Sequence, residues 1–226
     1  MTVLALAVIL VFVRLGVWQL HRAEEKRSLL AEYAAGQKSL VELAHADPTR
    51  LPRYQRVTAS GTFDSAHQIL LDNMPAQNGR PGYRVLTPLQ LTDGRLALID
   101  RGWVPLGTTR ADLPNIAVPE HQRTVTGQWD YPPEPGVRLG GPLEIPKTWP
   151  KVLNFPRQTD LDAVYGNRLL HGIVLLDPAV EDGYERAWQA HFGFGPERHL
   201  AYAVQWFALA VAVAVTYIVV NLRARK

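Results

Sequence analysis

The most constraining feature of this 226-residue chain is an uncharged segment that begins at His199 and ends at Leu222. It exceeds the roughly 20 residues that an α-helix needs to cross a hydrocarbon layer of about 30 Å, at about 1.5 Å per residue. The basic residues Arg223, Arg225 and Lys226 follow it directly. The sequence therefore predicts a transmembrane helix over residues 199–222 and a basic tail over residues 223–226.

A second apolar segment occupies residues 1–20, where Arg14 is the single charged residue. A cleaved signal peptide carries basic residues ahead of its apolar run and small residues at the cleavage site. Nothing basic precedes Arg14, and the LGVWQLHR sequence that starts at Leu15 is a poor cleavage site. We therefore expect residues 1–20 to form an uncleaved transmembrane helix.

The segment between the two helices, residues 21–198, has the composition of a water-exposed domain. It contains all 17 prolines, all 21 acidic residues and 20 of the 24 basic residues, so that the formal net charge of +3 arises from the two ends. A nucleic-acid-binding domain needs Lys and Arg clustered on its folded surface. Since this domain is nearly neutral, we do not expect nucleic acid among the partners. The two predicted helices imply contact with membrane lipid.

Two transmembrane helices place both termini on one side of the membrane. The basic tail predicts that this side is the cytoplasm or the mitochondrial matrix. Arg22, Lys26 and Arg27 oppose this assignment, although two glutamates lie among them. We expect a multi-pass protein of the bacterial inner membrane with an extracytoplasmic, periplasmic central domain, or a protein of the mitochondrial inner membrane if the source is eukaryotic.

Hydrophobic periodicity predicts a helical lead-in over residues 21–46, with one break, followed by a β-rich domain. The first helix is expected to continue to Gly36, and Ser39 could cap a further short helix. Beyond it, residues 57–63 and 125–131 alternate between the two faces of a strand, the second with Tyr131 on its buried face. Further strands are expected at residues 68–71, 83–91, 95–104 and 169–176. The expected fold is a membrane α + β protein, in which two transmembrane helices flank a single barrel or sandwich with small helices.

Composition excludes several kinds of chemistry. The chain has no cysteine, which excludes disulfides, cysteine-ligated zinc or iron–sulfur clusters and thiol nucleophiles. Its seven histidines include no pair at i, i+4, and the sequence has neither a hydrolase elbow nor a glycine-rich phosphate loop. We therefore do not expect an enzyme.

The candidate site lies at the outer ends of the two predicted helices. One face of the second helix carries His199, Tyr202 and Trp206 together with Ala203 and Ala210. Arg14, Trp18 and His21 share a face of the first helix. These residues fit an aromatic belt at the membrane interface, which spacing alone favours, or a flat slot beside the alanines for a planar ligand whose metal binds the imidazole. Arg14 could extend toward water, or have a polar partner such as Gln205 or a ligand.

Seven short motifs, taken in order, resemble the Surfeit-locus family of cytochrome c oxidase assembly proteins. They are LGVWQLHR (15–22), SGTFD (60–64), PGYRVLTPLQL (81–91), DG (93–94), IDRGWVP (99–105), VTGQWDYP (125–132) and ERHLAYAVQWFALA (197–210). The family architecture, two transmembrane helices that hold an outer β-rich domain, agrees with the one expected here.

The resemblance implies a non-enzymatic factor that binds haem a and assists its insertion into oxidase subunit I. It implies that His199 is the ligand of the haem iron. We expect Tyr202, Trp206 and Trp18 to contact the porphyrin, Arg14 to make a polar contact and His21 to be the next candidate ligand. The alternative is a scaffold without haem that binds subunit I or haem a synthase, with its aromatic residues used in helix packing. Arg101, Gly102 and Trp103 fit a structural role at least as well as a functional one.

Overall fold

The computed structural model describes residues 2–76, 78–136, 143–186, 188 and 194–223. These fall into two compact units. The helical unit comprises residues 1–32 and 190–226, and the β unit comprises residues 33–189. Each is described on its own.

Two long helices confirm the predicted spans. Helix α1 runs over Thr2–Gly36 and helix α3 over Pro196–Arg223, and both are long and apolar enough to cross a membrane. The expected continuation of α1 to Gly36 is also confirmed. A Cβ atom on Gly36 would lie 2.4 Å from the carbonyl oxygen of Tyr54, so only glycine permits this close approach at the helix end.

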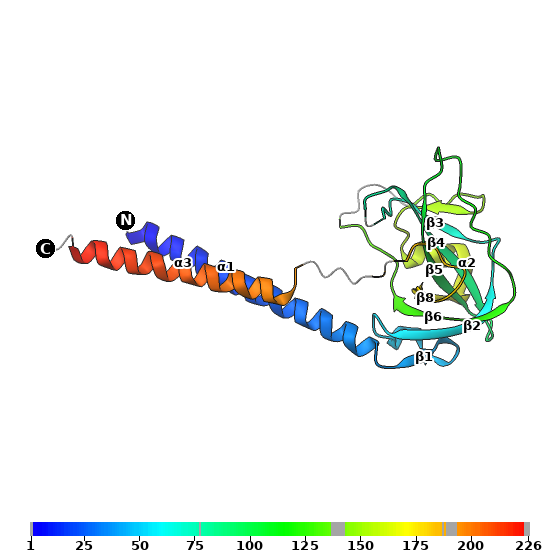
Figure 1. The fold of residues 1–226 in the computed structure, drawn as a ribbon, viewed down its shortest axis with the longest axis horizontal. Coiled ribbons are helices and arrows are strands. Elements are labelled where there is room, and N and C mark those ends of the chain that lie inside the picture. The colour runs from blue at the N-terminus through cyan, green and yellow to red at the C-terminus, as the bar shows by residue number, and fades with distance from the viewer. Residues whose placement is uncertain (1, 77, 137–142, 187, 189–193, 224–226) are drawn as a thin grey trace. The chain divides into compact units, whose positions relative to one another are not determined.

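The β unit is built on a closed barrel (Figure 1). Its five strands are β2 (Arg56–Phe63), β4 (Gly82–Leu91), β5 (Leu96–Pro105), β6 (Gln122–Asp130) and β8 (Leu169–Leu176). Hydrogen bonds connect them in the order β2-β6-β8-β5-β4, and β4 pairs again with β2. This last pairing closes the ring, so of the two expected architectures the domain adopts the barrel. β5 and β8 run parallel, and the other neighbouring pairs in the ring run antiparallel.

Shorter elements surround the barrel. Strand β1 (Leu40–Glu42) pairs with β2, strand β3 (Ile69–Leu71) with β4, and strand β7 (Lys151–Leu153) with β3. Helix α2 covers Gln158–Tyr165, and single 3-10 turns occupy Leu43–His45 (η1), Pro48–Arg50 (η2) and Gly166–Arg168 (η3).

One expected helix is wrong. The helical lead-in ends at Gly36, and the segment after Ser39 forms β1 and the turn η1 instead of a short helix. Leu40–Glu42 extends along β2 in parallel register, so the hydrogen bonds gained at the barrel edge outweigh the local helix preference of three residues.

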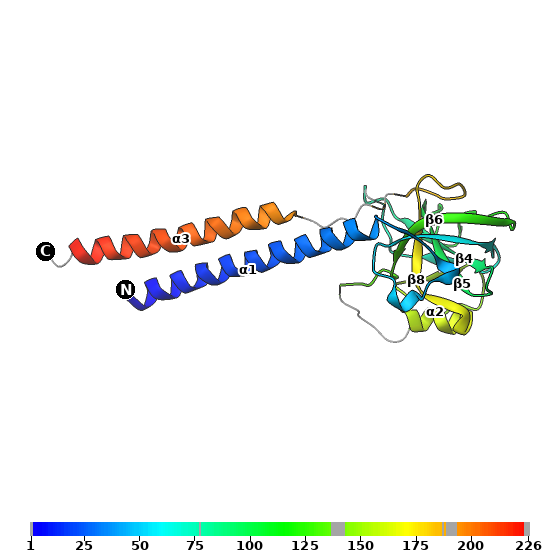
Figure 2. The same ribbon diagram turned by 90° about the horizontal axis from the view of Figure 1, so that it is seen from below.

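Two clusters of buried side chains identify the inside and the outside of the barrel. The interior cluster draws side chains from all five barrel strands, among them Val57, Leu89, Ile99, Trp129 and Val174. A second cluster on the outer surface packs Leu161 of α2 against residues of β3, β4, β5 and β8 (Figure 2). Strands β5 and β8 are thus buried on both faces along most of their length. Tyr131 was expected on the buried face but is 47% exposed, because β6 ends at Asp130.

A buried arginine fixes the end of the barrel. Arg101 is only 2% exposed, and its guanidinium donates to the carbonyl oxygens of Asp182 at 2.7 Å and Ile116 at 3.0 Å and to Oε1 of Gln68 at 3.2 Å. Burial lowers the pKa of Arg101. The neighbouring Trp103 is 7% exposed and donates its Nε1–H to the carbonyl oxygen of Met74 at 2.9 Å. Both contact sets hold loops to the barrel and fit the structural role expected for this motif.

Candidate functional site

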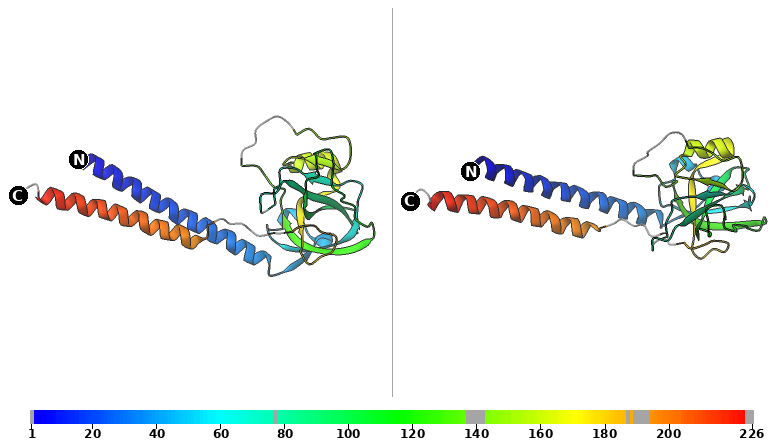
Figure 3. Two further views of the ribbon diagram at one scale, coloured as in Figure 1. Left: turned by 45° about the horizontal axis from the view of Figure 1, so that its top comes forward. Right: turned by 90° about the horizontal axis from the view of Figure 1, so that it is seen from above.

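In the helical unit, α1 and α3 lie side by side and meet along a seam (Figure 3). The seam residues are Phe12, Gly16, Gln19 and Ala23 on α1 and His199, Ala203, Trp206 and Ala210 on α3. Their spacing of three or four residues is that of one helix face. Small residues on such a face let two helix backbones approach closely within a membrane.

Several contacts fix the register of the seam. A Cβ atom on Gly16 would lie 2.7 Å from the ring of Phe207, so the phenyl ring occupies the space that glycine leaves. The rings of Phe12 and Trp206 have centroids 5.6 Å apart. Near the inner end, the hydroxyls of Thr2 and Tyr217 are 2.8 Å apart, which places the first turn of α1 close to the last turns of α3.

A polar pair lies in the seam at the outer ends of the predicted spans. Nδ1 of His199 is 2.8 Å from Oε1 of Gln19, and Gln19 is only 9% exposed. An amide oxygen accepts hydrogen bonds and cannot donate, so Nδ1 of His199 carries the proton. In the neutral ring the lone pair is then on Nε2, which is the atom left to bind a metal.

The residues predicted from the second helix fall partly on this seam. His199 and Trp206 are half-buried there, and Tyr202 stands beside it with 40% of its surface exposed. Ala203 and Ala210 are 1% and 6% exposed because α1 covers them. The flat slot expected beside the two alanines is therefore not formed, since the space above them is filled by the neighbouring helix.

The residues predicted from the first helix do share a face, but this face points away from α3. Arg14, Trp18 and His21 are all exposed, whereas Gln19 and Ala23 face the seam. Within the part of the chain that the structure describes, Arg14 has no hydrogen bond or ion pair, and Gln205 is likewise exposed. The guanidinium of Arg22 lies 5.7 Å from the centroid of the Trp18 ring.

Sequence reasoning missed Gln19. The residue lies three positions after Gly16 and four before Ala23, which is the spacing of a single helix face. That pattern of small residues around one amide could have identified it as an interhelical hydrogen-bonding group. The prediction instead selected Arg14, Trp18 and His21, which lie on the opposite face of α1.

The donor set limits the kind of metal that this site could take. Among the described residues, no group of three or more His, Asp or Glu side chains is positioned to hold a metal ion. A metal bound by His199 would have to bring most of its own ligands, as an iron porphyrin does.

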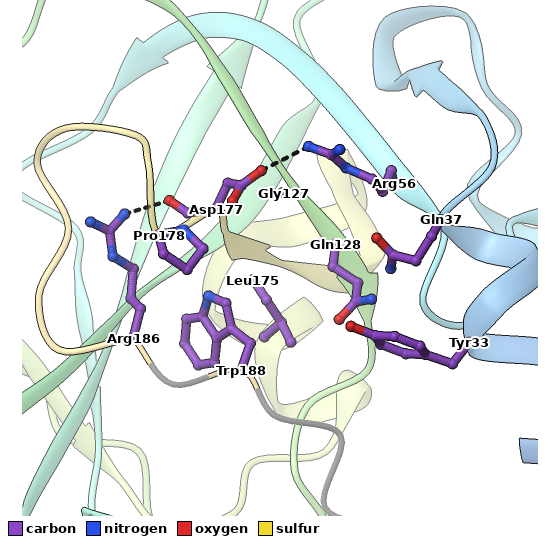
Figure 4. Close-up of a pocket in the computed structure, with 10 residues that line it drawn as sticks. All are labelled: Tyr33, Gln37, Arg56, Gly127, Gln128, Leu175, Asp177, Pro178, Arg186 and Trp188. Carbon is purple, nitrogen blue, oxygen red and sulfur yellow. Dashed lines mark hydrogen bonds and ion pairs between the residues drawn. The ribbon is translucent and has the colours of Figure 1, made fainter. Parts of the chain in front are cut away.

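The β unit contains a separate cavity of about 500 Å³ (Figure 4). Asp177 lies in its wall between Arg56 and Arg186, where its Oδ2 accepts from Nη2 of Arg56 at 2.8 Å and its carbonyl oxygen accepts from Nη1 of Arg186 at 2.7 Å. Trp188 forms part of the wall and donates its Nε1–H to the carbonyl oxygen of Leu176 at 2.5 Å. The charged groups of this cavity thus bind the domain's own chain.

Comparisons with known proteins agree with the architecture. The chain matches the SURF1 family over residues 6–211. It is 25% identical to a SURF1-like protein of Rickettsia conorii over 94% of this chain and 88% of the relative. It is 27% identical to a SURF1-like protein of Monosiga brevicollis over 87% of this chain and 78% of the relative.

The family match covers most of α1, the whole barrel and the first part of α3, up to residue 211. A membrane protein with this architecture agrees with the expectation from the seven sequence motifs. The chain therefore belongs to the SURF1 family, which is known generally as a family of cytochrome c oxidase assembly factors rather than of enzymes.

Proposed function

We propose that this protein assists the assembly of a haem a-containing cytochrome c oxidase by binding haem a through His199 and presenting it to subunit I. The observation that carries the proposal is the 2.8 Å hydrogen bond between His199 and Gln19, which directs the lone pair of the imidazole to Nε2. A histidine whose other ring nitrogen is engaged in this way is the usual form of a haem axial ligand.

The surroundings of His199 suit a haem. Tyr202, one turn further along α3, and Trp18, next to Gln19 on α1, are 40% and 48% exposed and offer apolar surface to a porphyrin. Arg22 and Arg198 are exposed near the outer ends of the two predicted spans, within the water-facing region where propionates would bind guanidinium groups. Arg14, the expected secondary polar contact, and His21, the next candidate ligand, lie on the outward face of α1, so neither side chain faces His199.

The proposed location is the bacterial inner membrane, with the β unit in the periplasm, or the mitochondrial inner membrane in a eukaryote. The basic residues after Leu222 favour a cytoplasmic or matrix position for the termini. The contact between Thr2 and Tyr217, at the inner end of the helix pair, agrees with both termini lying on one side. Membrane lipid would then surround the outward faces of α1 and α3.

A second candidate is a scaffold that binds subunit I or haem a synthase without holding haem. It is favoured by the coverage of Ala203 and Ala210 and by the contact of Trp206 with Phe12, because both use the seam for helix packing. In that case His199 would stabilise the helix pair through Gln19 and have no further role.

Deletion of the gene and complementation test the proposed function. Deletion should lower the haem a content and activity of the oxidase and leave b-type and c-type cytochromes unchanged. His199→Ala should fail to restore the oxidase although it is made at normal levels, whereas Trp206→Phe, which keeps an aromatic ring, should restore most of it. Equal loss of all cytochromes in the deletion strain would contradict a role in oxidase assembly, and full rescue by His199→Ala would favour the scaffold.

A further inference from the structure

We infer that Gln19 is a positioning residue that holds the ring of His199 with Nε2 available to haem iron. The inference rests on the proposed function, because it assigns to Gln19 a role toward the haem that His199 would bind. Gln19 itself would touch neither the iron nor the porphyrin and would act through His199 alone.

The geometry of the pair is that of a fixed hydrogen bond. Gln19 and His199 are on opposite helices, and Oε1 and Nδ1 are 2.8 Å apart. Gln19 is 9% exposed between Gly16 and Ala23, so its side chain has little freedom to turn away. Among the described residues, His199 is the hydrogen-bond partner of the Gln19 side chain.

The hydrogen bond has two consequences for the imidazole. It fixes the tautomer, since Nδ1 must donate, and it fixes the rotation of the ring about its bond to Cβ. It also makes Nε2 a better electron donor, because an acceptor at Nδ1 draws the ring toward imidazolate character. A neutral amide gives this effect more weakly than a carboxylate at the same position would.

Helix packing alone does not explain a glutamine here. The other α1 residues of the seam are Phe12, Gly16 and Ala23, which are apolar. An apolar side chain of similar volume would fill the position of Gln19 without the desolvation cost of an amide. The side chain of Gln19 instead contacts the imidazole of His199, so its contribution beyond packing is to orient that ring.

The test compares three variants of the full-length protein, purified in detergent and loaded with haem a. Gln19→Leu removes the acceptor at similar volume, and Gln19→Glu replaces it by a stronger one. Gln205→Leu is the matched control, because Gln205 is a glutamine exposed on α3. The readouts are the affinity for haem a, the reduction potential of the bound haem and the tautomer of His199 in the haem-free protein, followed by nitrogen NMR and assigned with His199→Ala.

Gln19→Leu should weaken haem a binding about 10- to 100-fold, as is typical when the partner of a metal-bound histidine is removed. It should also raise the reduction potential, whereas Gln19→Glu should lower it, and Gln205→Leu should change neither. In haem-free protein, His199 should carry its proton on Nδ1 in the wild type and lose this preference in Gln19→Leu. A purely structural role would not shift the potential in opposite directions for two variants.

Other results would overturn the inference. If wild-type protein binds haem through His199 but both Gln19 variants keep its affinity and potential, Gln19 is not a positioning residue and the proposed function stands. If wild-type His199 carries its proton on Nε2, the inferred hydrogen bond is wrong whether or not haem binds. If folded wild-type protein takes up no haem a, the proposed haem binding fails, and with it any role of Gln19 toward the iron.

Discussion

Two buried polar side chains, Gln19 and Arg101, have opposite kinds of partner. Among the described residues, Gln19 has one partner, Nδ1 of His199 on the neighbouring helix. Arg101 donates to the carbonyl oxygens of Asp182 and Ile116 and to Oε1 of Gln68, so its guanidinium is engaged by groups within the β unit. The first arrangement suits binding and the second suits stability.

Arg101→Met should destabilise the β unit. The substitution keeps a long apolar stem but leaves the carbonyl oxygen of Asp182 without its donor, whereas the carbonyl oxygen of Ile116 keeps its second donor, Nε2 of Gln68. An acceptor left unsatisfied costs about 1–3 kcal/mol, so we expect a loss of at least ~1 kcal/mol in the free energy of unfolding. Arg168→Met is the control, because Arg168 is exposed. Unfolding can be monitored by near-ultraviolet circular dichroism. The same unfolding midpoint for both variants would contradict a stabilising role of Arg101.

At the scale of elements, the seam between α1 and α3 determines where His199 can point. Its closest packing is at Gly16, where a side chain would collide with Phe207. The polar pair lies about one turn further along α1, so the register of the helices and the hydrogen bond of Gln19 depend on the same packing.

Gly16→Leu should separate α1 from α3. A leucine does not fit at 2.7 Å from the Phe207 ring, so either the ring turns out of the seam, which loses its packing on α1, or the helices move apart. Val17→Leu is the control, since Val17 is 40% exposed beside the seam. The natural chain has no cysteine, so cysteines placed at Thr2 and Tyr217 can be joined by a short bifunctional maleimide. Linkage should fall in Gly16→Leu and persist in Val17→Leu, and undiminished linkage in both would show that the seam tolerates the change.

Long elements were predictable from the sequence, whereas the short ones were not, except β3, which the strand expected at residues 68–71 anticipated. Both helices and the five barrel strands follow from apolar length and from alternation, which act over eight residues or more. β1 and β7 are three residues long, and α2 has eight residues with a single buried one, Leu161, so local pattern is weak there and tertiary pairing decides.

The candidate site was predicted for α3 but not for α1. His199 and Trp206 are on the seam as their spacing indicated. One face of α1 carries aromatic and charged residues, and the other carries small residues. Either face could pack against a second helix, so the sequence of α1 alone does not show which of them α3 covers. The role of Gln19 as a hydrogen-bond partner of His199 follows only from the packing of α1 against α3.

At the scale of the whole molecule, the chain comprises a helix pair and a barrel, and a basic tail follows the second helix. The basic residues that follow Leu222 favour a cytoplasmic C-terminus in a bacterial host. Alkaline phosphatase is active only after export, so a fusion at the C-terminus should be inactive, and an insertion after Thr108 in the β unit should be active. An active C-terminal fusion would contradict the proposed topology.

The proposed binding of haem a can be measured by absorbance of the purified full-length protein. The protein should be prepared from one host that makes haem a and from another that does not, at matched expression levels. We expect the absorbance bands of haem a in the first preparation, their absence from the second, and their loss in His199→Ala from the first host. Folded wild-type protein that carries no haem a in either preparation, yet supports oxidase assembly in the cell, would show that the protein acts without binding haem a.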